Sequence, residues 1–79
     1  MENYNEKRNK AIKQCVKEVI EKYPKELKKW YKGGKRSLKY EKKIIKSNEV
    51  QTLLNEYSET YTERMAIIYA LTLKLIVYI

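Results

Sequence analysis

Histidine is missing from this 79-residue chain, and cysteine occurs once, at Cys15. A single cysteine cannot form an intramolecular disulfide, so the chain suits a reducing compartment. One cysteine without histidine also excludes a structural zinc site and histidine-based acid–base catalysis. Cys15 falls on an apolar stripe, which favours a buried structural thiol over a reactive one. We therefore expect that the protein is not an enzyme and that it binds no metal, no cofactor and no small-molecule substrate.

Acidic residues are few, and phenylalanine is absent although there are eight tyrosines. The chain has 18 Lys and Arg against 10 Asp and Glu, which gives a net charge of +8. Residues 1–46 hold 16 of these cations and six acids, whereas residues 47–79 hold two cations and four acids. The sequence predicts a single domain, 1–79, with a basic half at 1–46 and an apolar assembly half at 47–79.

Long hydrophobic runs are also lacking. The first ten residues are polar and charged, with no apolar segment behind them, so no secretory signal is recognisable. The apolar run from Met65 to Ile79 is 15 residues long and contains Lys74. A membrane span needs about 20 apolar residues. We expect a cytoplasmic protein that does not enter a membrane.

Apolar residues at spacings of three and four predict a first helix over 5–23, with Asn3 or Asn5 as its cap. Pro24 should end that helix and open a second one over 25–32, since proline is tolerated in a first turn. Gly33-Gly34 should terminate the second helix.

A third helix is predicted over 38–46, capped by Ser37, and the apolar phase then changes near Ser47-Asn48. The rest, 48–79, is either one long helix or two helices that meet near Thr60, where Thr60 and Glu63 form a capping-box pattern. No strand signal competes. The predicted fold is all-α, a small bundle of about four helices.

Lysines recur at helical spacing around pairs of larger residues, and offsets of zero, three, four and seven place them on one helical face. Like charges at such spacings repel, so their concentration predicts an anionic partner, either nucleic acid or an acidic protein surface. A merely solvated face is the equally weighted alternative. A looser third set is Lys10, Lys13 and Lys17. The candidate binding residues are Lys25, Lys28, Lys29, Lys32, Lys35, Arg36, Lys39, Lys42, Lys43 and Lys46.

Aromatic residues are interleaved with these lysines. Trp30, Tyr31 and Tyr40 either stack on bases or belong to the core, and core is the commoner role. Gly33-Gly34 followed by Lys35 lacks the spacing and the preceding strand of a phosphate-binding P-loop. We therefore interpret the glycines as a helix terminator.

Apolar residues in the last third alternate by four and three, which is the spacing of a coiled-coil seam. The helix expected over the apolar run from Met65 to Ile79 is apolar nearly all round. We therefore expect a homo-oligomer built on this helix. Packing of this helix inside the monomer is the alternative. The predicted interface residues are Tyr57, Tyr61, Arg64, Ile68, Leu71, Leu75 and Tyr78.

The order of features resembles the front part of phage transcriptional regulators of the ArpU/RinA type, over Ile12 to Tyr78. Such proteins begin with a helix ending near Tyr-Pro, followed by a glycine-containing loop and a long helix rich in Ile, Val and Leu. The resemblance does not include the helix-turn-helix on which the family's DNA reading would depend. The matching residues are Tyr23-Pro24, Gly33-Gly34, Ile44, Ile45, Val50, Leu53 and Leu54.

The resemblance and the basic half together predict a small phage or mobile-element regulator that binds nucleic acid. A phage-encoded inhibitor of anti-defence type, with its basic face in an acidic protein groove, is the first alternative. A membrane-active leaderless bacteriocin is the second, since basic helices with Trp and Tyr also suit membrane interfaces.

Overall fold

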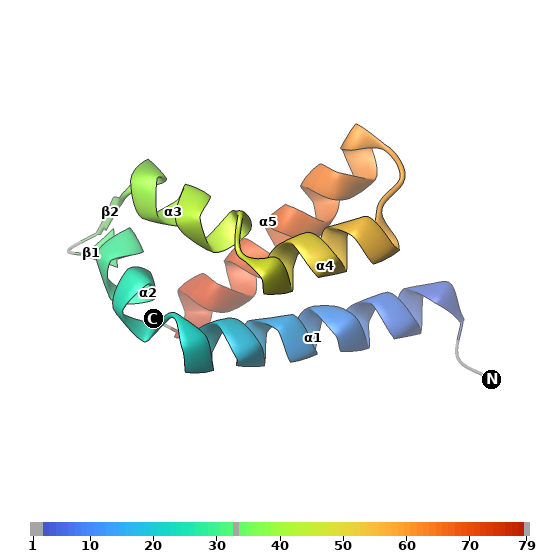
Figure 1. Cartoon of the computed structure of the whole chain (residues 1–79), viewed down its shortest axis with the longest axis horizontal. Coiled ribbons are helices and arrows are strands. Elements are labelled where there is room, and N and C mark those ends of the chain that lie inside the picture. Colours follow the sequence, from blue (N-terminus) through green and yellow to red (C-terminus); the bar gives the residue numbers. More distant parts are fainter. Residues whose placement is uncertain (1–2, 33, 79) are drawn as a thin grey trace.

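The computed structural model describes residues 3–32 and 34–78, and helices dominate them (Figure 1). The predicted all-α class is confirmed, although five helices replace the expected four. A two-stranded sheet lies between the second and third helices. The elements are α1 (Tyr4–Lys22), α2 (Pro24–Trp30), β1 (Tyr31–Lys32), β2 (Lys35–Arg36), α3 (Leu38–Ile45), α4 (Asn48–Tyr57) and α5 (Tyr61–Tyr78).

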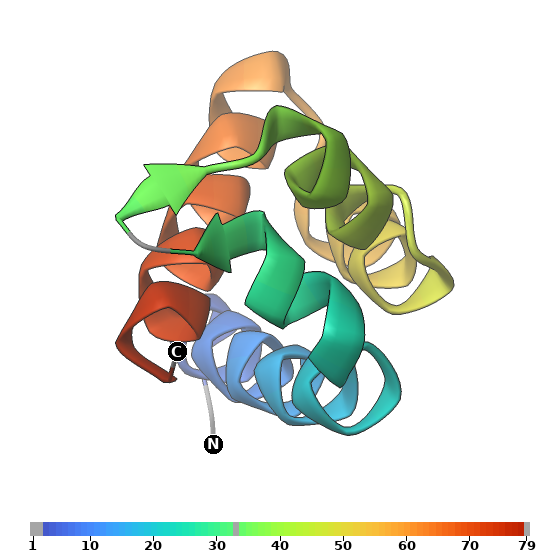
Figure 2. The ribbon, with the colours of Figure 1, turned by 90° about the vertical axis from the view of Figure 1, so that its left-hand side faces the viewer.

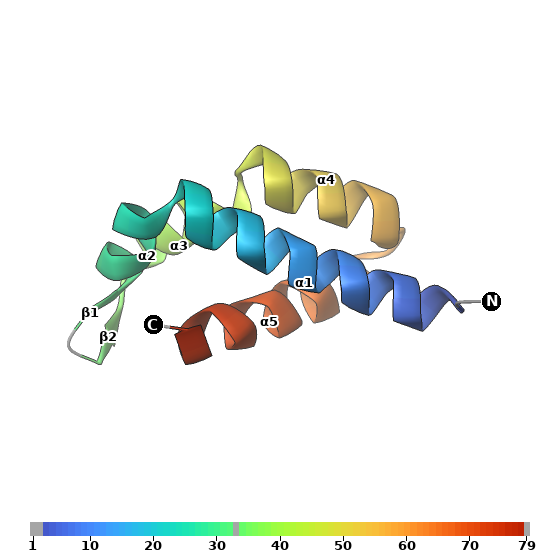
Figure 3. The same cartoon turned by 90° about the horizontal axis from the view of Figure 1, so that it is seen from below.

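Helix α1 runs along the length of the molecule, which measures 42 Å by 23 Å by 20 Å. It contacts both α4 and α5, and Figure 3 shows it crossing between them. Helices α2 and α3 pack on each other at one end, together with the hairpin, while the turn from α4 to α5 lies at the opposite end (Figure 1). The basic and apolar halves therefore meet along α1.

One hydrophobic core receives side chains from every helix. Trp30 and Leu27 of α2 are each 1% exposed, so the short second helix is anchored deeply. Burying a large apolar side chain stabilises the fold by about 1.5–3 kcal/mol. The buried apolar residues are Ile12, Cys15, Val19, Leu27, Trp30, Ile44, Val50, Leu53, Leu54, Ile67, Leu71 and Leu75.

The ends of the first two helices follow from their local sequence. Asn3 caps α1, because its side-chain oxygen accepts a hydrogen bond from the backbone N–H of Glu6 at 2.9 Å. Asn5 lies within the helix. Pro24 occupies the first turn of α2, as expected, since a residue at that position has no helical carbonyl to bond to.

The hairpin was not expected from the sequence. Helix α2 ends at Trp30, and the prediction that it continues to residue 32 is wrong. Tyr31 pairs with Arg36 and Lys32 with Lys35 in an antiparallel ladder. Gly34 has a φ of 76°, a left-handed geometry that only glycine adopts without strain and that suits a tight turn. Gly33, the other glycine of the predicted terminator, lies outside the described residues.

Both uncertain joints of the second half are real breaks. Helix α3 ends at Ile45 and α4 begins at Asn48, which confirms the phase change near Ser47. The Ser47 hydroxyl donates to the Ile44 carbonyl at 2.6 Å, satisfying a carbonyl at the end of α3. Ser37 precedes α3 as its cap, but its side chain makes no capping hydrogen bond.

The second break, between α4 and α5, lies at the predicted capping box. The backbone N–H of Glu63 donates to the Thr60 hydroxyl at 3.1 Å, and that hydroxyl donates to the Glu63 carboxylate at 3.2 Å. Residues 48–79 therefore form two helices, the second of the two alternatives. Ile79, the predicted end of the helix, lies outside the described residues.

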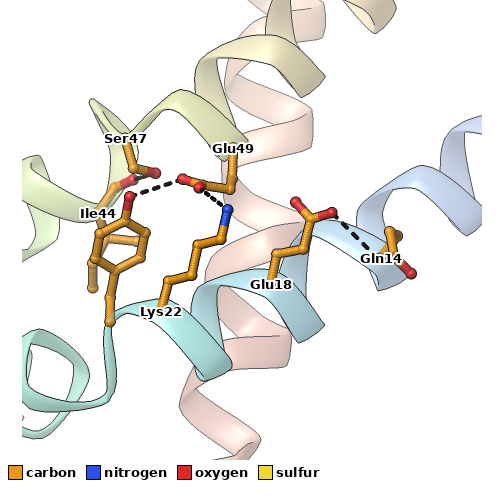
Figure 4. Close-up of polar contacts among 7 residues, drawn as sticks. Gln14, Glu18, Lys22, Ile44, Ser47 and Glu49 are labelled. Carbon is orange, nitrogen blue, oxygen red and sulfur yellow. Dashed lines mark hydrogen bonds and ion pairs between the residues drawn. The ribbon is translucent and has the colours of Figure 1, made fainter.

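A polar network joins the end of α1 to the start of α4 (Figure 4). The Glu49 carboxylate accepts hydrogen bonds from Lys22 at 2.8 Å and from the Tyr23 hydroxyl at 2.9 Å. These bonds, chiefly the one from Lys22, lower the pKa of Glu49. On the neighbouring turn of α1, Gln14 donates to Glu18 at 3.3 Å. The α1–α4 contact thus has a polar bridge beside its apolar core.

Over residues 3–32 and 34–78, no helix is both long enough and apolar enough to cross a membrane. Helix α5 is the most apolar of the five, and its buried side is occupied by the other helices.

Two leucines on α5 provide a matched test of this packing. Leu71 is 1% exposed and Leu73 is 46% exposed. Leu71→Ala should lower the free energy of unfolding by about 2–5 kcal/mol, because it leaves a cavity in the core. Leu73→Ala should cost less than about 1 kcal/mol. Urea denaturation followed by circular dichroism measures both, and equal losses would contradict the assigned orientation of α5.

Candidate nucleic-acid interface

All ten predicted binding residues are solvent-exposed. They lie on α2, on the two strands of the hairpin, on α3 and at the residue that follows α3. These elements form one end of the molecule, which faces the viewer in Figure 2. The first requirement of a binding surface, exposure, is met at every position.

Two sets of lysines at helical spacing, which we call the lysine ladders, meet at a single aromatic ring. They are Lys25, Lys28, Lys29 and Lys32, and Lys39, Lys42, Lys43 and Lys46. The ammonium nitrogen of Lys29 on α2 lies 5.5 Å from the centre of the Tyr40 ring. Lys39 and Lys43, from α3, lie 5.9 Å and 5.2 Å from the same centre. The packing of α2 on α3 therefore brings together lysines that are 14 positions apart in the sequence. We call Lys29, Lys39, Lys43 and Tyr40 the Tyr40 cluster.

Tyr40 is half-buried between these lysines, and its ring partly offsets their mutual repulsion. A cation over an aromatic face at an exposed site contributes about 0.5–1 kcal/mol. The sequence had suggested that this tyrosine stacks on a base or enters the core. Its observed position between lysines of two helices depends on how those helices pack, so no local spacing could have revealed it.

Neither of the other aromatic candidates is fully exposed, as a platform for base stacking would be. Trp30 is 1% exposed, and its indole N–H donates to the Glu41 carboxylate at 3.1 Å. It belongs to the core, which was the commoner of the two predicted roles. Tyr31 is half-buried. Among the described residues of α2, the hairpin and α3, no aromatic side chain is fully exposed.

Arg36 differs from the nine lysines, because it is held by an acid. Its guanidinium donates two hydrogen bonds to Glu41, one of them at 2.6 Å to Oε1 and the other to Oε2. The bonds from Arg36 lower the pKa of Glu41, with a further contribution from Trp30. The pair ties β2 to α3. Arg36 is thus better suited to positioning the hairpin than to binding an external anion, and sequence reasoning missed Glu41.

The nine remaining candidates keep their charge uncompensated. Within the described parts of the chain, none of these lysines has an acidic partner at ion-pairing distance. On the hairpin, Lys32 and Lys35 face each other across the ladder. The surface is therefore a concentration of unpaired ammonium groups supported by buried Trp30 and by the Arg36–Glu41 pair.

The third, looser lysine set lies elsewhere. Lys10, Lys13 and Lys17 are exposed on α1 and take no part in the Tyr40 cluster. The resemblance among the three segments is therefore one of helical spacing, and only two of them combine into one surface.

The predicted oligomer residues divide into two groups. Leu71 and Leu75 are each 1% exposed and lie in the core of the monomer, so a partner could not reach them in this fold. For these two, packing inside the monomer is what the structure shows. Tyr57, Arg64 and Ile68 are half-buried, whereas Tyr61 and Tyr78 are exposed.

The break near Thr60 places Tyr57 on α4 and the other six predicted residues on α5. Besides Tyr61 and Tyr78, helix α5 exposes Met65, Tyr69, Leu73 and Val77, which recur every four residues.

The described residues give little support for a reactive thiol or a metal site. Burial raises the pKa of Cys15 to about 11, so its thiol stays protonated at neutral pH. Across residues 3–32 and 34–78, no group of three or more His, Cys, Asp and Glu side chains is placed to hold a metal ion.

Comparisons with protein-family models, with curated proteins and with solved structures find no match to this chain.

The Arg36–Glu41 pair predicts how stability depends on pH. Because the pKa of Glu41 is lowered in the folded state, the stability it contributes is present above the ordinary glutamate pKa of about 4.3. It is lost as the pH falls through the lower pKa of the folded state. Glu41→Gln should therefore destabilise the protein at pH 7, and its deficit should shrink steadily below about pH 4.

Denaturant unfolding of both proteins between pH 2 and pH 7 measures this difference. Glu56→Gln is the matched control, since Glu56 is exposed and makes no hydrogen bond or ion pair in the described structure. A constant deficit across the whole pH range would show that the charge of Glu41 contributes nothing.

Proposed function

We propose that this protein is a small non-enzymatic regulator that binds the phosphate backbone of a nucleic acid through the lysines of α2, the hairpin and α3. The observation that carries the proposal is the Tyr40 cluster. Three ammonium groups from two helices lie within 6 Å of one ring centre, and no described acid neutralises them. Such repulsion is costly for a fold of this size, and bound phosphates would relieve it.

The kind of contact follows from the side chains available. Lysine is a flexible point charge that meets phosphates well but lacks the planar fork with which arginine recognises guanine. The single arginine of the surface is already engaged with Glu41. Because no aromatic side chain described on these elements is fully exposed, they do not favour stacking on unpaired bases. Backbone contacts that are independent of sequence are the mode that these groups support.

The two halves of the chain would then have separate tasks. The basic end would hold the nucleic acid, and the outward face of α5 would join copies of the chain. The resemblance to ArpU/RinA-type regulators supports placing this activity in a phage or a mobile element.

A charge-reversal experiment tests the proposal. The triple variant K29E/K39E/K43E removes the Tyr40 cluster, and the matched triple variant K7E/K13E/K17E reverses three exposed lysines of α1. Both variants have the same net charge. In an electrophoretic mobility assay at low salt, the cluster variant should lose at least about tenfold in affinity for DNA or RNA, while the control keeps most of it.

Circular dichroism shows whether each variant is folded. Equal losses in the two variants would mean that net charge alone drives binding. If the wild-type protein retains neither DNA nor RNA, the proposed function is wrong.

Salt and sequence dependence provide a second test. If six to ten phosphates are contacted, the affinity should fall by about 10³–10⁵ between 50 and 200 mM salt. Two unrelated duplexes of equal length should bind with dissociation constants that agree within about threefold, because backbone contacts carry no sequence information. Fluorescence anisotropy measures both quantities. A shallow salt dependence with strong sequence preference would point to base contacts and contradict the proposed mode.

A further inference from the structure

Helix α5 exposes an apolar line on the side that faces away from the core. Met65, Tyr69, Leu73 and Val77 are 43%, 66%, 46% and 86% exposed. They recur every four residues along a helix of 18 residues, which is about 27 Å long. A contiguous apolar patch of this kind on a small protein usually marks an interaction surface. We call these four residues the outer line of α5.

A shallow groove of about 180 Å³ borders the outer line. Its other wall is formed by Arg36 and Glu41, whose charges cancel in their ion pair. The groove floor includes Ile68, Thr72 and Ile76. An apolar side chain that protrudes from a partner could therefore enter the groove without meeting an uncompensated charge.

Charge decides which partner can approach this face. The chain has a net charge of +8, and the surplus lies in residues 1–46. Two copies would repel if their lysine surfaces met, but α5 itself carries only Glu63, Arg64 and Lys74. The outer line is thus a face on which a second copy can approach without bringing the two lysine ladders together.

The positions of Glu63 and Lys74 favour one arrangement of the two copies. They are 11 residues apart, close to three helical turns, so they lie on the same edge of α5. The midpoint between them falls between Ile68 and Tyr69, within the span of the outer line. When two identical helices pack antiparallel about a two-fold axis at that midpoint, Glu63 of each copy lies level with Lys74 of the other.

A two-fold antiparallel pair also brings the same edge of both helices together, so the two opposite charges face each other twice. A parallel pair about a two-fold axis would instead place these edges on opposite sides of the interface, so that neither charge would meet its counterpart.

We propose that two copies of this chain form an antiparallel homodimer through the outer line of α5, with Glu63 of each copy facing Lys74 of the other. This inference rests on the proposed association through α5 and is independent of nucleic-acid binding. A tyrosine buries about 150–250 Å² when covered completely, and a standard interface buries about 800 Å² on each partner. Because the outer line is short, we expect a dissociation constant in the micromolar range.

A charge-swap experiment on the full chain tests the arrangement. In sedimentation equilibrium at low salt, K74E and E63K should each weaken self-association several-fold, because like charges then face each other twice. An equimolar mixture of the two variants should form a heterodimer about as strong as the wild-type dimer, since both pairs are then opposite in charge. Tyr69→Glu should leave a folded monomer, because it places a charge at the centre of the interface.

The capping box calls for one control. E63K also removes the carboxylate that accepts from Thr60, so its unfolding free energy is measured alongside K74E, which leaves the cap intact. A wild-type protein that stays monomeric at hundreds of micromolar would overturn association through α5 and leave nucleic-acid binding unaffected. A dimer that is indifferent to K74E, or a mixture that forms no heterodimer, would overturn the antiparallel arrangement alone.

Discussion

The burial of Trp30 is the constraint on which the basic end of the molecule depends. Its ring lies in the core at 1% exposure, while its indole N–H reaches out to Glu41, which also receives the guanidinium of Arg36. The Glu41 carboxylate thus joins α2, the hairpin and α3 above the buried indole ring. Once these elements are held together, the exposed sides of the two helices must lie next to each other. The meeting of lysines around Tyr40 is a consequence of this packing, and the local repulsion that results is offset by burial beneath it.

The second half of the chain supports the basic end from inside the core. Six of the buried apolar residues come from α4 and α5, among them Leu54 and Leu71, so the apolar half completes the core that supports the basic end. The two sides of helix α5 therefore differ. Its inner side stabilises the monomer, and its outer line, which includes Tyr69, remains free of contacts that would bury it. An apolar helix in a small domain can be buried on one side and exposed on the other, because its neighbours cover only part of its circumference.

Much of the fold was predictable because its signals are local. Proline at the start of α2, the phase change at Ser47 and the capping box at Thr60 each act within a single turn of helix, and each lies where it was expected. The hairpin was missed for the opposite reason. Two glycines between Lys32 and Lys35 fit a helix terminator and a tight hairpin turn equally well. Pairing between β1 and β2 then shortens α2, and such a ladder leaves no periodicity in strands of two residues.

The sequence by itself determined the helical class, the joints between helices and the concentration of positive charge before residue 47, because these depend on residue type and spacing along the chain. Only the tertiary structure decided which lysines share a surface, that Trp30 is core, that Arg36 is occupied by Glu41, and that Leu71 and Leu75 face inward. Each of these depends on contacts between residues distant in the sequence. Helical periodicity states which side chains share a face, but the packing of that face against its neighbours determines whether it is buried or exposed.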